Sequence, residues 1–108
     1  MAKATKCVLV SEEEGCVSEI ESQLGADLFT LLKGTATFIG QLPDTDVILM
    51  KCDQSQFQLM RNRNPLPFPF HEEVVDGPVL FVRMDEDANP RNFTLQEYRL
   101  LASTGTQQ

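Results

Sequence analysis

The sequence lacks the short motifs that mark the common enzyme classes. It contains no GxSxG nucleophile elbow, no HExxH helix, no GxGxxG turn and no phosphate loop ending in GKS or GKT. Convergent active sites need no local signature, so this absence is only weak evidence against catalysis. The sequence assigns no catalytic residue, and we favour a non-catalytic role.

Disulfide and zinc frameworks are lacking too. Cys7, Cys16 and Cys52 are the only cysteines and form no CxxC pair, and His71 is the single histidine. An odd number of cysteines without ligand spacing is typical of free thiols in a reducing compartment. We therefore predict that the protein holds no cofactor and no metal.

One string has the spacing of a calcium loop. Asp85, Asp87 and Asn89 match the first three ligand positions of an EF-hand. Pro90 stands where the loop needs glycine, and Gln96 stands where it needs a bidentate glutamate. We therefore expect no calcium site.

Positive charge and long apolar runs are scarce. The chain has 9 Lys and Arg against 16 Asp and Glu, which gives a formal net charge of −7. A phosphate backbone would be repelled on average, so we expect no nucleic-acid partner. No window approaches the ~20 apolar residues of a membrane span, and no signal-peptide stretch follows the opening MAKATK. We expect no membrane partner and a cytoplasmic location.

The composition is that of an ordinary globular domain, with 42% apolar and 23% charged residues among 108. This length allows one hydrophobic core. We predict a single small α+β domain over residues 1–102 and a flexible C-terminal tail over residues 103–108. The sheet is expected to be mainly antiparallel or mixed, with about five to six short strands.

The first part of the chain predicts a hairpin and a short helix. Cys7–Val10 and Cys16–Ile20 are suited to strands, and a polar turn separates them. Asp27–Lys33 fits a short helix that Gly34 stops. Apolar residues from Val17 to Leu31 also fall near helical spacing, but Gly25 argues against one long helix.

The middle of the chain predicts the core of the sheet. Thr35–Gln41 and Val47–Met50 flank a polar turn and form the clearest hairpin. The apolar runs Val47–Met50 and Val79–Val82 are typical of central strands that are covered on both faces. The alternation in Gln56–Met60 predicts a further strand.

The end of the chain predicts a helix. Thr94 and Glu97 have the spacing of a capping box, in which each side chain bonds the other residue's backbone N–H. Phe93 and Tyr98 occupy the two positions of a hydrophobic staple. We therefore expect a C-terminal helix that begins after Thr94 and docks on the core.

Five segments together carry a family resemblance. They are KCVLVSEEEGCVSEIE (6–21), LLKGTATFIG (31–40), NRNPLP (62–67), DGPVLFVRMDED (76–87) and FTLQEY (93–98). In their order, the chain resembles a family of small uncharacterised α+β domains found in phages, bacteria and some eukaryotic or giant-virus genomes. The resemblance implies the same fold and no known activity, so it supplies no catalytic residue.

The segment Arg61–Gly77 is the longest irregular stretch of the chain. Its alternate prolines, Pro65, Pro67 and Pro69, favour an extended polyproline-like path that Phe68 and Phe70 would pin to the body of the domain. Compact domains seldom carry so long a loop without a functional reason. We therefore expect the loop to be a binding element.

The start of this loop holds the main candidate binding residues, Arg61, Asn62, Arg63 and Asn64. Guanidinium groups recognise carboxylates and phosphates in two-point fashion, and a locally basic loop would stand out on an acidic body. The structural alternative is that the asparagines shape the turn and bond the backbone. In that case the arginines would pair with Glu72, Glu73 or Asp76.

His71 and Arg83 complete the set of candidate binding residues. His71 would at most tune the charge of the loop with pH, or would be a plain surface residue. Arg83 and Lys51 each follow a buried apolar run. They would face one anion if their strands were parallel neighbours, and would otherwise emerge separately at the rim of the sheet.

Three functions fit these observations. The first is a non-catalytic interaction or regulatory domain that binds a protein, a second copy of itself or a small anionic ligand. The second is a small hydrolase or transferase that uses Arg63, His71, Arg83 and Asp85. The third is an acidic mimic of nucleic acid. A pocket that joins those four residues would favour the enzyme, and an exposed apolar patch would favour a protein partner.

Overall fold

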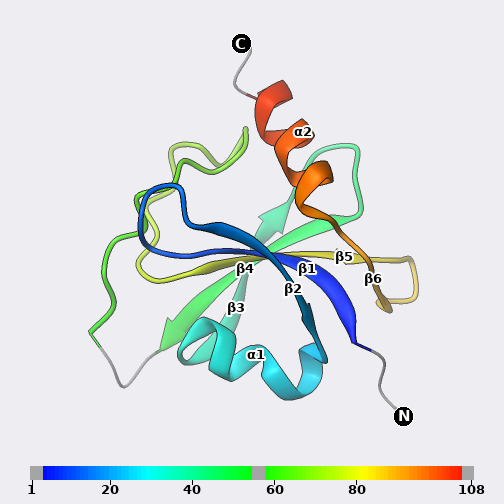
Figure 1. Cartoon of the computed structure of the whole chain (residues 1–108), viewed down its shortest axis with the longest axis horizontal. Helices are drawn as coiled ribbons and strands as arrows, with labels where there is room; N and C mark the ends of the chain where they lie inside the picture. Colours follow the sequence, from blue (N-terminus) through cyan, green and yellow to red (C-terminus); the bar gives the residue numbers. More distant parts are fainter. Residues whose placement is uncertain (1–3, 55–57, 106–108) are drawn as a thin grey trace.

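A six-stranded antiparallel sheet organises the molecule, with one helix on each of its faces (Figure 1). The computed structural model describes residues 4–54 and 58–105. The elements are, in chain order, β1 (Thr5–Val10), β2 (Val17–Ser22), α1 (Leu24–Leu32), β3 (Thr35–Gln41), β4 (Val47–Gln54), β5 (Val79–Met84), β6 (Pro90–Arg91) and α2 (Leu95–Gly105). The predicted α+β class is confirmed, in its antiparallel form.

The strand order is β2-β1-β5-β4-β3, and the short β6 pairs with the end of β5. The central strand is β5, which pairs with both β1 and β4. Its residues Val79–Val82 are all fully buried, as an apolar run covered on both faces requires. The prediction that Val47–Met50 and Val79–Val82 are central strands is therefore confirmed.

Side chains alternate between the two faces of the sheet and form two cores. The core under α2 contains Val8, Val10, Leu42, Val47, Leu49, Leu66, Val75, Val79, Phe81, Phe93 and Tyr98. The core under α1 contains Cys7, Leu24, Leu32, Cys52, Leu80 and Val82. We call these two sides of the sheet the α2 face and the α1 face.

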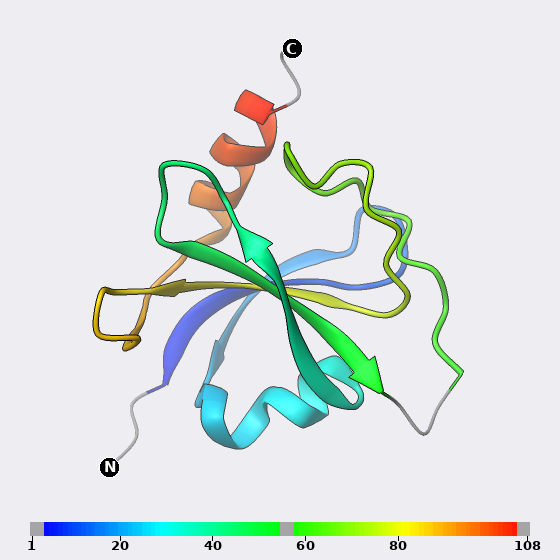
Figure 2. The same ribbon diagram turned by 180° about the vertical axis from the view of Figure 1, so that it is seen from behind.

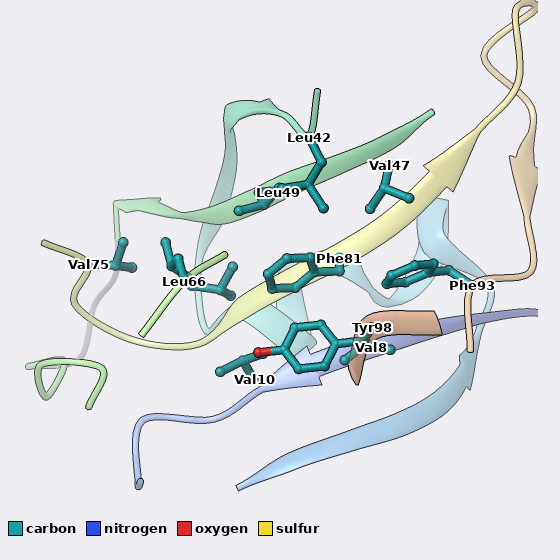
Figure 3. Close-up of a cluster of buried hydrophobic side chains, with 11 residues drawn as sticks. Val8, Val10, Leu42, Val47, Leu49, Leu66, Val75, Phe81, Phe93 and Tyr98 are labelled. Carbon is teal, nitrogen blue, oxygen red and sulfur yellow. The ribbon is translucent and has the colours of Figure 1, made fainter. Parts of the chain in front are cut away.

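Phe81 lies at the middle of the α2 face (Figure 3). Its ring meets the ring of Tyr98 edge to face, with 5.0 Å between the centroids. Fully burying a side chain of this size contributes about 2–3 kcal/mol. Leu66 and Val75 belong to the same core and come from the segment between β4 and β5, so that segment is fastened to the sheet (Figure 3).

The helix α1 begins three residues earlier than predicted, at Leu24, and includes Gly25. The carboxylate of Asp27 explains the early start, because it accepts hydrogen bonds from the backbone N–H of Gln23 and the hydroxyl of Ser22. The helix ends with Lys33 in the left-handed region at φ 65°, so Lys33, not Gly34, adopts the conformation that stops it.

The capping box of α2 is confirmed. The backbone N–H of Thr94 donates to the Glu97 carboxylate, and the N–H of Glu97 donates to the Thr94 hydroxyl, both at 3.2 Å. Phe93 and Tyr98 are both buried, as the staple requires. The helix runs to Gly105, so the predicted tail boundary at residue 103 falls inside α2, and residues 106–108 lie outside the described residues.

Other expectations for the sheet differ from the structure. β2 begins at Val17, one residue later than expected. β4 extends past the predicted end at Met50 to Gln54, because Gln54 still pairs with Thr35. In the predicted strand Gln56–Met60, residues 58–60 are not in a strand, and the other two lie outside the described residues. The prediction fails because an alternating pattern does not by itself supply a partner strand.

Lys51 and Arg83 do not share one end of a face. β4 and β5 are antiparallel, so Lys51 lies opposite Val79 at one end of the pair and Arg83 lies opposite Val47 at the other. The option in which Lys51 and Arg83 lie on parallel neighbouring strands and face one anion is therefore wrong. The two cations lie at opposite ends of the strand pair.

Candidate functional site

The loop Arg61–Gly77 is closed at its base by a short pairing. Arg61 lies opposite Asp76 in an isolated antiparallel bridge. The N–H of Asn62 donates to the carbonyl of Val75 at 2.8 Å, and the N–H of Gly77 donates to the carbonyl of Met60 at 2.7 Å. The loop lies beside the turn between β1 and β2 in both views of the molecule (Figures 1 and 2).

The side chain of Asn62 ties this base to the sheet. Its amide donates to the carbonyl of Val10 at 3.1 Å, at the end of β1, and to the carbonyl of Gly77 at 2.9 Å. Its oxygen accepts the N–H of Asn64 at 2.9 Å. Asn62 therefore satisfies backbone groups from three parts of the chain at once.

Asn64 ties the loop to the turn between β1 and β2. Its amide donates to the carbonyls of Ser11 and Glu13, both at 2.7 Å, and its oxygen accepts the N–H of Gly15 at 2.7 Å. The polar groups of both asparagines are thus used inside the fold, as the structural alternative expects for the asparagines.

The two arginines point away from this network. Arg61 and Arg63 are both exposed, while Asn62 between them turns inward. Arg61 Nε lies 3.9 Å from Asp76 Oδ1, and the two side chains are 71% and 63% exposed. Within the part of the chain that the structure describes, the guanidinium of Arg63 has neither a hydrogen bond nor an ion pair.

The aromatic residues of the loop behave differently from each other. Phe70 packs on β3, where a Cβ added to Gly40 would come within 2.5 Å of the Phe70 ring. Phe68 is 48% exposed and stacks on His71, with 5.4 Å between the ring centroids. Of these two phenylalanines, Phe70 is the one that pins the loop to the sheet, so that expectation is confirmed for Phe70 and wrong for Phe68.

The predicted extended path does not continue through all three prolines. Residues 65–67 have no regular structure, but a turn begins at Phe68, whose bond to Pro69 is cis. Pro67 and Leu66 are buried, so the first part of the path runs against the core. The turn then brings His71 beside Phe68 on the surface.

Arg83 lies at the other end of β5 and is enclosed by acceptors. Its Nε is 2.8 Å from Asp46 Oδ1, and its Nη1 is 2.7 Å from Glu97 Oε2. Nη1 also donates to the carbonyl of Asn92 at 3.1 Å, and Cζ lies 5.5 Å from the centre of the Phe93 ring. We call Arg83, Asp46 and Glu97 the Arg83 cluster.

The electrostatics of the Arg83 cluster favour its charged form. Burial alone would lower the pKa of Arg83, but its hydrogen bonds and charge interactions with Glu97 and Asp46 raise the pKa above its usual value. Burial alone would raise the pKa of Glu97, but the hydrogen bonds from Arg83 and Thr94 bring the pKa below its usual value. The positive charge of Arg83 is thus balanced within the fold.

Asp85, the first residue of the calcium-like string, organises a turn. Its Oδ1 accepts the N–H groups of Asp87 and Asn89, both at 2.9 Å, and Arg91 Nε lies 3.0 Å from its Oδ2. The backbone hydrogen bond from Asn89 is the main cause that lowers the pKa of Asp85. Among the described residues, no three His, Cys, Asp or Glu side chains are grouped to hold a metal ion.

An open groove of about 270 Å³ lies near the start of β4 and the end of β5, lined by Gln41, Asp46, Ile48, Met84, Asp85 and Glu86. Of the four residues in the enzyme alternative, only Asp85 lines this groove. Arg63 and His71 belong to the loop before β5, and Arg83 is engaged with Asp46 and Glu97. The groove therefore does not join the four residues of the enzyme alternative.

Sequence reasoning missed the groove and the Arg83 cluster. A signal for the cluster was present, because Arg83 shares strand parity with the buried Phe81 and therefore lies on the α2 face, where the capping box of α2 also docks. The groove brings together residues of three separate segments, so no local sequence pattern predicts it.

No helix of the described residues is long and apolar enough to cross a membrane.

Comparisons with known proteins identify the family of this chain. No curated protein and no solved structure matches the chain significantly. A model of a family of unknown function, DUF5880, matches residues 8–101. The predicted resemblance to an uncharacterised family is confirmed, and the chain belongs to the family of unknown function DUF5880.

Proposed function

We propose that this protein is a non-catalytic binding domain, and that the loop Arg61–Gly77 contacts an anionic surface of a protein partner. One observation carries the proposal. The loop is fixed from inside by the hydrogen bonds of Asn62 and Asn64, while the guanidiniums of Arg61 and Arg63 face solvent.

The charges of the two arginines are available to a partner. An ion pair between exposed groups, such as Arg61 with Asp76, contributes at most about 1 kcal/mol, so exchanging it for a partner's carboxylate costs little. Arginine forks bind carboxylates through two parallel hydrogen bonds. On a chain of net charge −7, these side chains offer a local positive point to an acidic surface.

The exposed apolar side chains of the loop favour a protein over a small ion. Phe68 is 48% exposed and Val74 is 62% exposed. The Phe68 ring also stacks on His71, which adds an aromatic surface. Arginine and aromatic residues are enriched at protein interfaces, and an inorganic ion would leave the apolar groups in water.

The fixed base of the loop lowers the cost of binding. A partner that orders a flexible loop must compensate the entropy that the loop loses. Here the hydrogen bonds of Asn64 to the turn between β1 and β2, and the buried Leu66 and Val75, already hold the loop in place. The arginines are thus presented from a preorganised backbone.

A reducing, cytoplasmic location belongs to the same proposal. Cys7, Cys16 and Cys52 are all free thiols. Burial raises the pKa of Cys7 to about 11, so its thiol stays protonated and unreactive near neutral pH. Free cysteines suit a compartment in which thiols remain reduced.

The test is a thermal-shift screen with acidic peptides that contain an aromatic residue, and with inorganic phosphate as the small-anion comparison. We expect peptides to raise the melting temperature and phosphate to leave it nearly unchanged. The variant Arg61→Ala with Arg63→Ala should lose the peptide-induced shift.

A matched control makes the screen specific. Arg91→Ala with Arg99→Ala removes the same charge from exposed positions outside the loop and should keep the peptide-induced shift. If both double variants lose binding equally, the effect is one of net charge and the proposal is wrong. A shift with phosphate as large as with peptides would replace the protein partner by a small anion.

A further inference from the structure

The two edges of the sheet are protected to different degrees. The β2 edge carries Glu19 and Glu21, and Glu19 also accepts the N–H of Leu95 at the start of α2 at 2.9 Å. The β3 edge reads TATFIGQ and has neither a charge nor a proline. Among the described residues, no strand pairs with the outer side of β3. Charges and prolines are among the means by which proteins block an open edge, and β3 has neither, although a bulge interrupts it. β3 is therefore the more open edge.

A bulge places two residues of β3 on the same face. Phe38 pairs with Met50 and Gln41 pairs with Ile48, and the register shifts between Phe38 and Gly40. Met50 and Ile48 are two residues apart, so both lie on the α1 face. The extra residue in β3 therefore turns Gln41 to the same face as Phe38, although the two are three positions apart in sequence.

Phe38 is 58% exposed on this face and leaves an apolar surface beside the open edge. Ile48 and Met50, on the neighbouring strand, are partly buried and pack against the core under α1. A strand added to β3 would cover part of the Phe38 ring. The apolar contact and the unpaired edge thus favour the same occupant, an extended segment.

The groove described above continues this surface at the end of β3. Ile48 and Met84 supply its apolar lining, and Asp46, Asp85 and Glu86 supply carboxylates. Asp46 and Asp85 already pair with Arg83 and Arg91. Glu86 is exposed, and no ion pair to it exists within residues 4–54 and 58–105.

We propose that the outer edge of β3 binds an extended, basic segment of a partner protein as an added strand. One apolar side chain of the segment would lie on Phe38. A lysine or arginine would place its aliphatic stem on Ile48 and Met84 and its charge beside Glu86. Charge complementarity selects this occupant, because a second copy of the chain would bring another net charge of −7 to an acidic groove.

The test begins with selection of random short peptides displayed on phage against the full chain. We expect enriched peptides to alternate apolar residues with lysine or arginine. Synthetic copies should shift the amide resonances of residues 35–41 when titrated into the isotope-labelled protein. The proposal is overturned if no peptide of this basic, alternating kind is enriched, or if the shifts that such a peptide causes map away from β3.

Three variants then test the contacts. Phe38→Lys should remove the apolar contact and add a charge that repels the basic segment, and Glu86→Lys should repel its lysine or arginine. Each variant should weaken binding of a selected peptide by about tenfold or more. Glu14→Lys changes the net charge as Glu86→Lys does, but at the turn between β1 and β2, and should leave binding within about twofold. Equal losses in Glu14→Lys and Glu86→Lys would contradict the proposal.

Two further outcomes separate this site from the others. Dimerisation of the free protein that Phe38→Lys abolishes would mean that β3 binds a second copy, which contradicts the proposed occupant. The proposal for the loop and the proposal for β3 are tested separately, because Arg61→Ala with Arg63→Ala should leave peptide binding at β3 unchanged. A loss of peptide binding in that double variant would place the peptide on the loop and overturn the β3 site.

Discussion

Arginines at the two ends of β5 are used in opposite ways. At one end, Arg83 is bound by two carboxylates at 2.8 Å and 2.7 Å and by a backbone carbonyl, and its side chain is 26% exposed. At the other end, Arg61 has one ion pair of 3.9 Å and is 71% exposed. The same residue type thus holds the fold together in one region and is left available to solvent in the other.

The difference follows from the position of each arginine relative to the core. Arg83 lies near the end of a buried strand, on the α2 face. Its side chain therefore lies among Phe93, Glu97 and the turn that carries Asp46. Arg61 and Arg63 alternate with an asparagine whose side chain faces inward, so their own side chains face outward. The charge of an arginine does not by itself identify a binding residue. What matters is whether carboxylates of the fold already neutralise that charge.

The largest effect is expected from Arg83→Ala. Removing the guanidinium leaves Asp46 and Glu97 without their shared cation and the carbonyl of Asn92 without its donor. The Arg83 side chain is 26% exposed, while Asp46 and Glu97 are 52% and 37% exposed. We therefore expect a loss of about 2–3 kcal/mol in unfolding free energy, which is less than the loss on breaking a fully buried pair. Chemical denaturation measures it.

Arg91→Ala is the matched control for Arg83→Ala. Arg91 pairs with Asp85 but is 64% exposed, so its loss should cost at most about 1 kcal/mol. If Arg83→Ala is no more destabilising than Arg91→Ala, the Arg83 cluster does not stabilise the fold, and the contrast between the two regions disappears.

The next effect concerns the support of the loop. Asn62→Ala leaves the carbonyls of Val10 and Gly77 without their amide donor, and we expect a loss of about 2 kcal/mol. The amides of the loop should exchange their hydrogens faster, because its base is no longer tied to β1. Asn89→Ala, at an exposed position, should change neither quantity. Unchanged exchange in Asn62→Ala would show that the asparagine network does not hold the loop.

A smaller effect depends on pH. The pKa of Glu97 is lowered in the folded protein, so its charge stabilises the fold above its unfolded pKa, and this stabilisation is lost as the pH falls through the folded pKa. Glu97→Gln keeps a capping side chain but removes the charge. We expect it to cost less than about 1 kcal/mol at neutral pH, because the side chain is 37% exposed.

The pH series checks the sign of this effect. The stability gap between the original protein and Glu97→Gln should narrow as the pH falls through the lowered pKa of Glu97, because Glu97 of the original protein then also becomes neutral. Denaturation curves at several pH values measure the gap. A gap that widens in acid would mean that the Glu97 charge does not contribute through Arg83.

Much of the fold could be predicted from local patterns. The apolar run Val79–Val82 identified the central strand, and Thr94 with Glu97 identified the start of α2, because burial on both faces and capping depend on neighbouring residues in sequence. The start of α1 was misplaced, because the Asp27 carboxylate bonds the N–H of Gln23 and compensates for Gly25. The antiparallel pairing of β4 with β5, which places Lys51 and Arg83 at opposite ends, could not be predicted from local patterns, because it joins segments that are far apart in sequence.

The candidate site was predictable only in part. The sequence identified the loop and raised both roles for its asparagines, since Asn is suited to turns and to backbone hydrogen bonds. It could not show that Asn64 reaches Ser11 and Glu13, because those residues lie about fifty positions away in sequence. For the same reason it proposed Arg83 as a binding residue without seeing that Asp46 and Glu97 balance its charge.

The most direct test of the central claim compares the unfolding free energy of Arg61→Ala with Arg63→Ala against that of Arg83→Ala under identical conditions. If the loop arginines are reserved for binding, the double variant should stay within about 0.5 kcal/mol of the original protein, while Arg83→Ala should lose about 2–3 kcal/mol. A double variant that unfolds, or that is destabilised as much as Arg83→Ala, would show that the loop arginines are structural and would contradict the account.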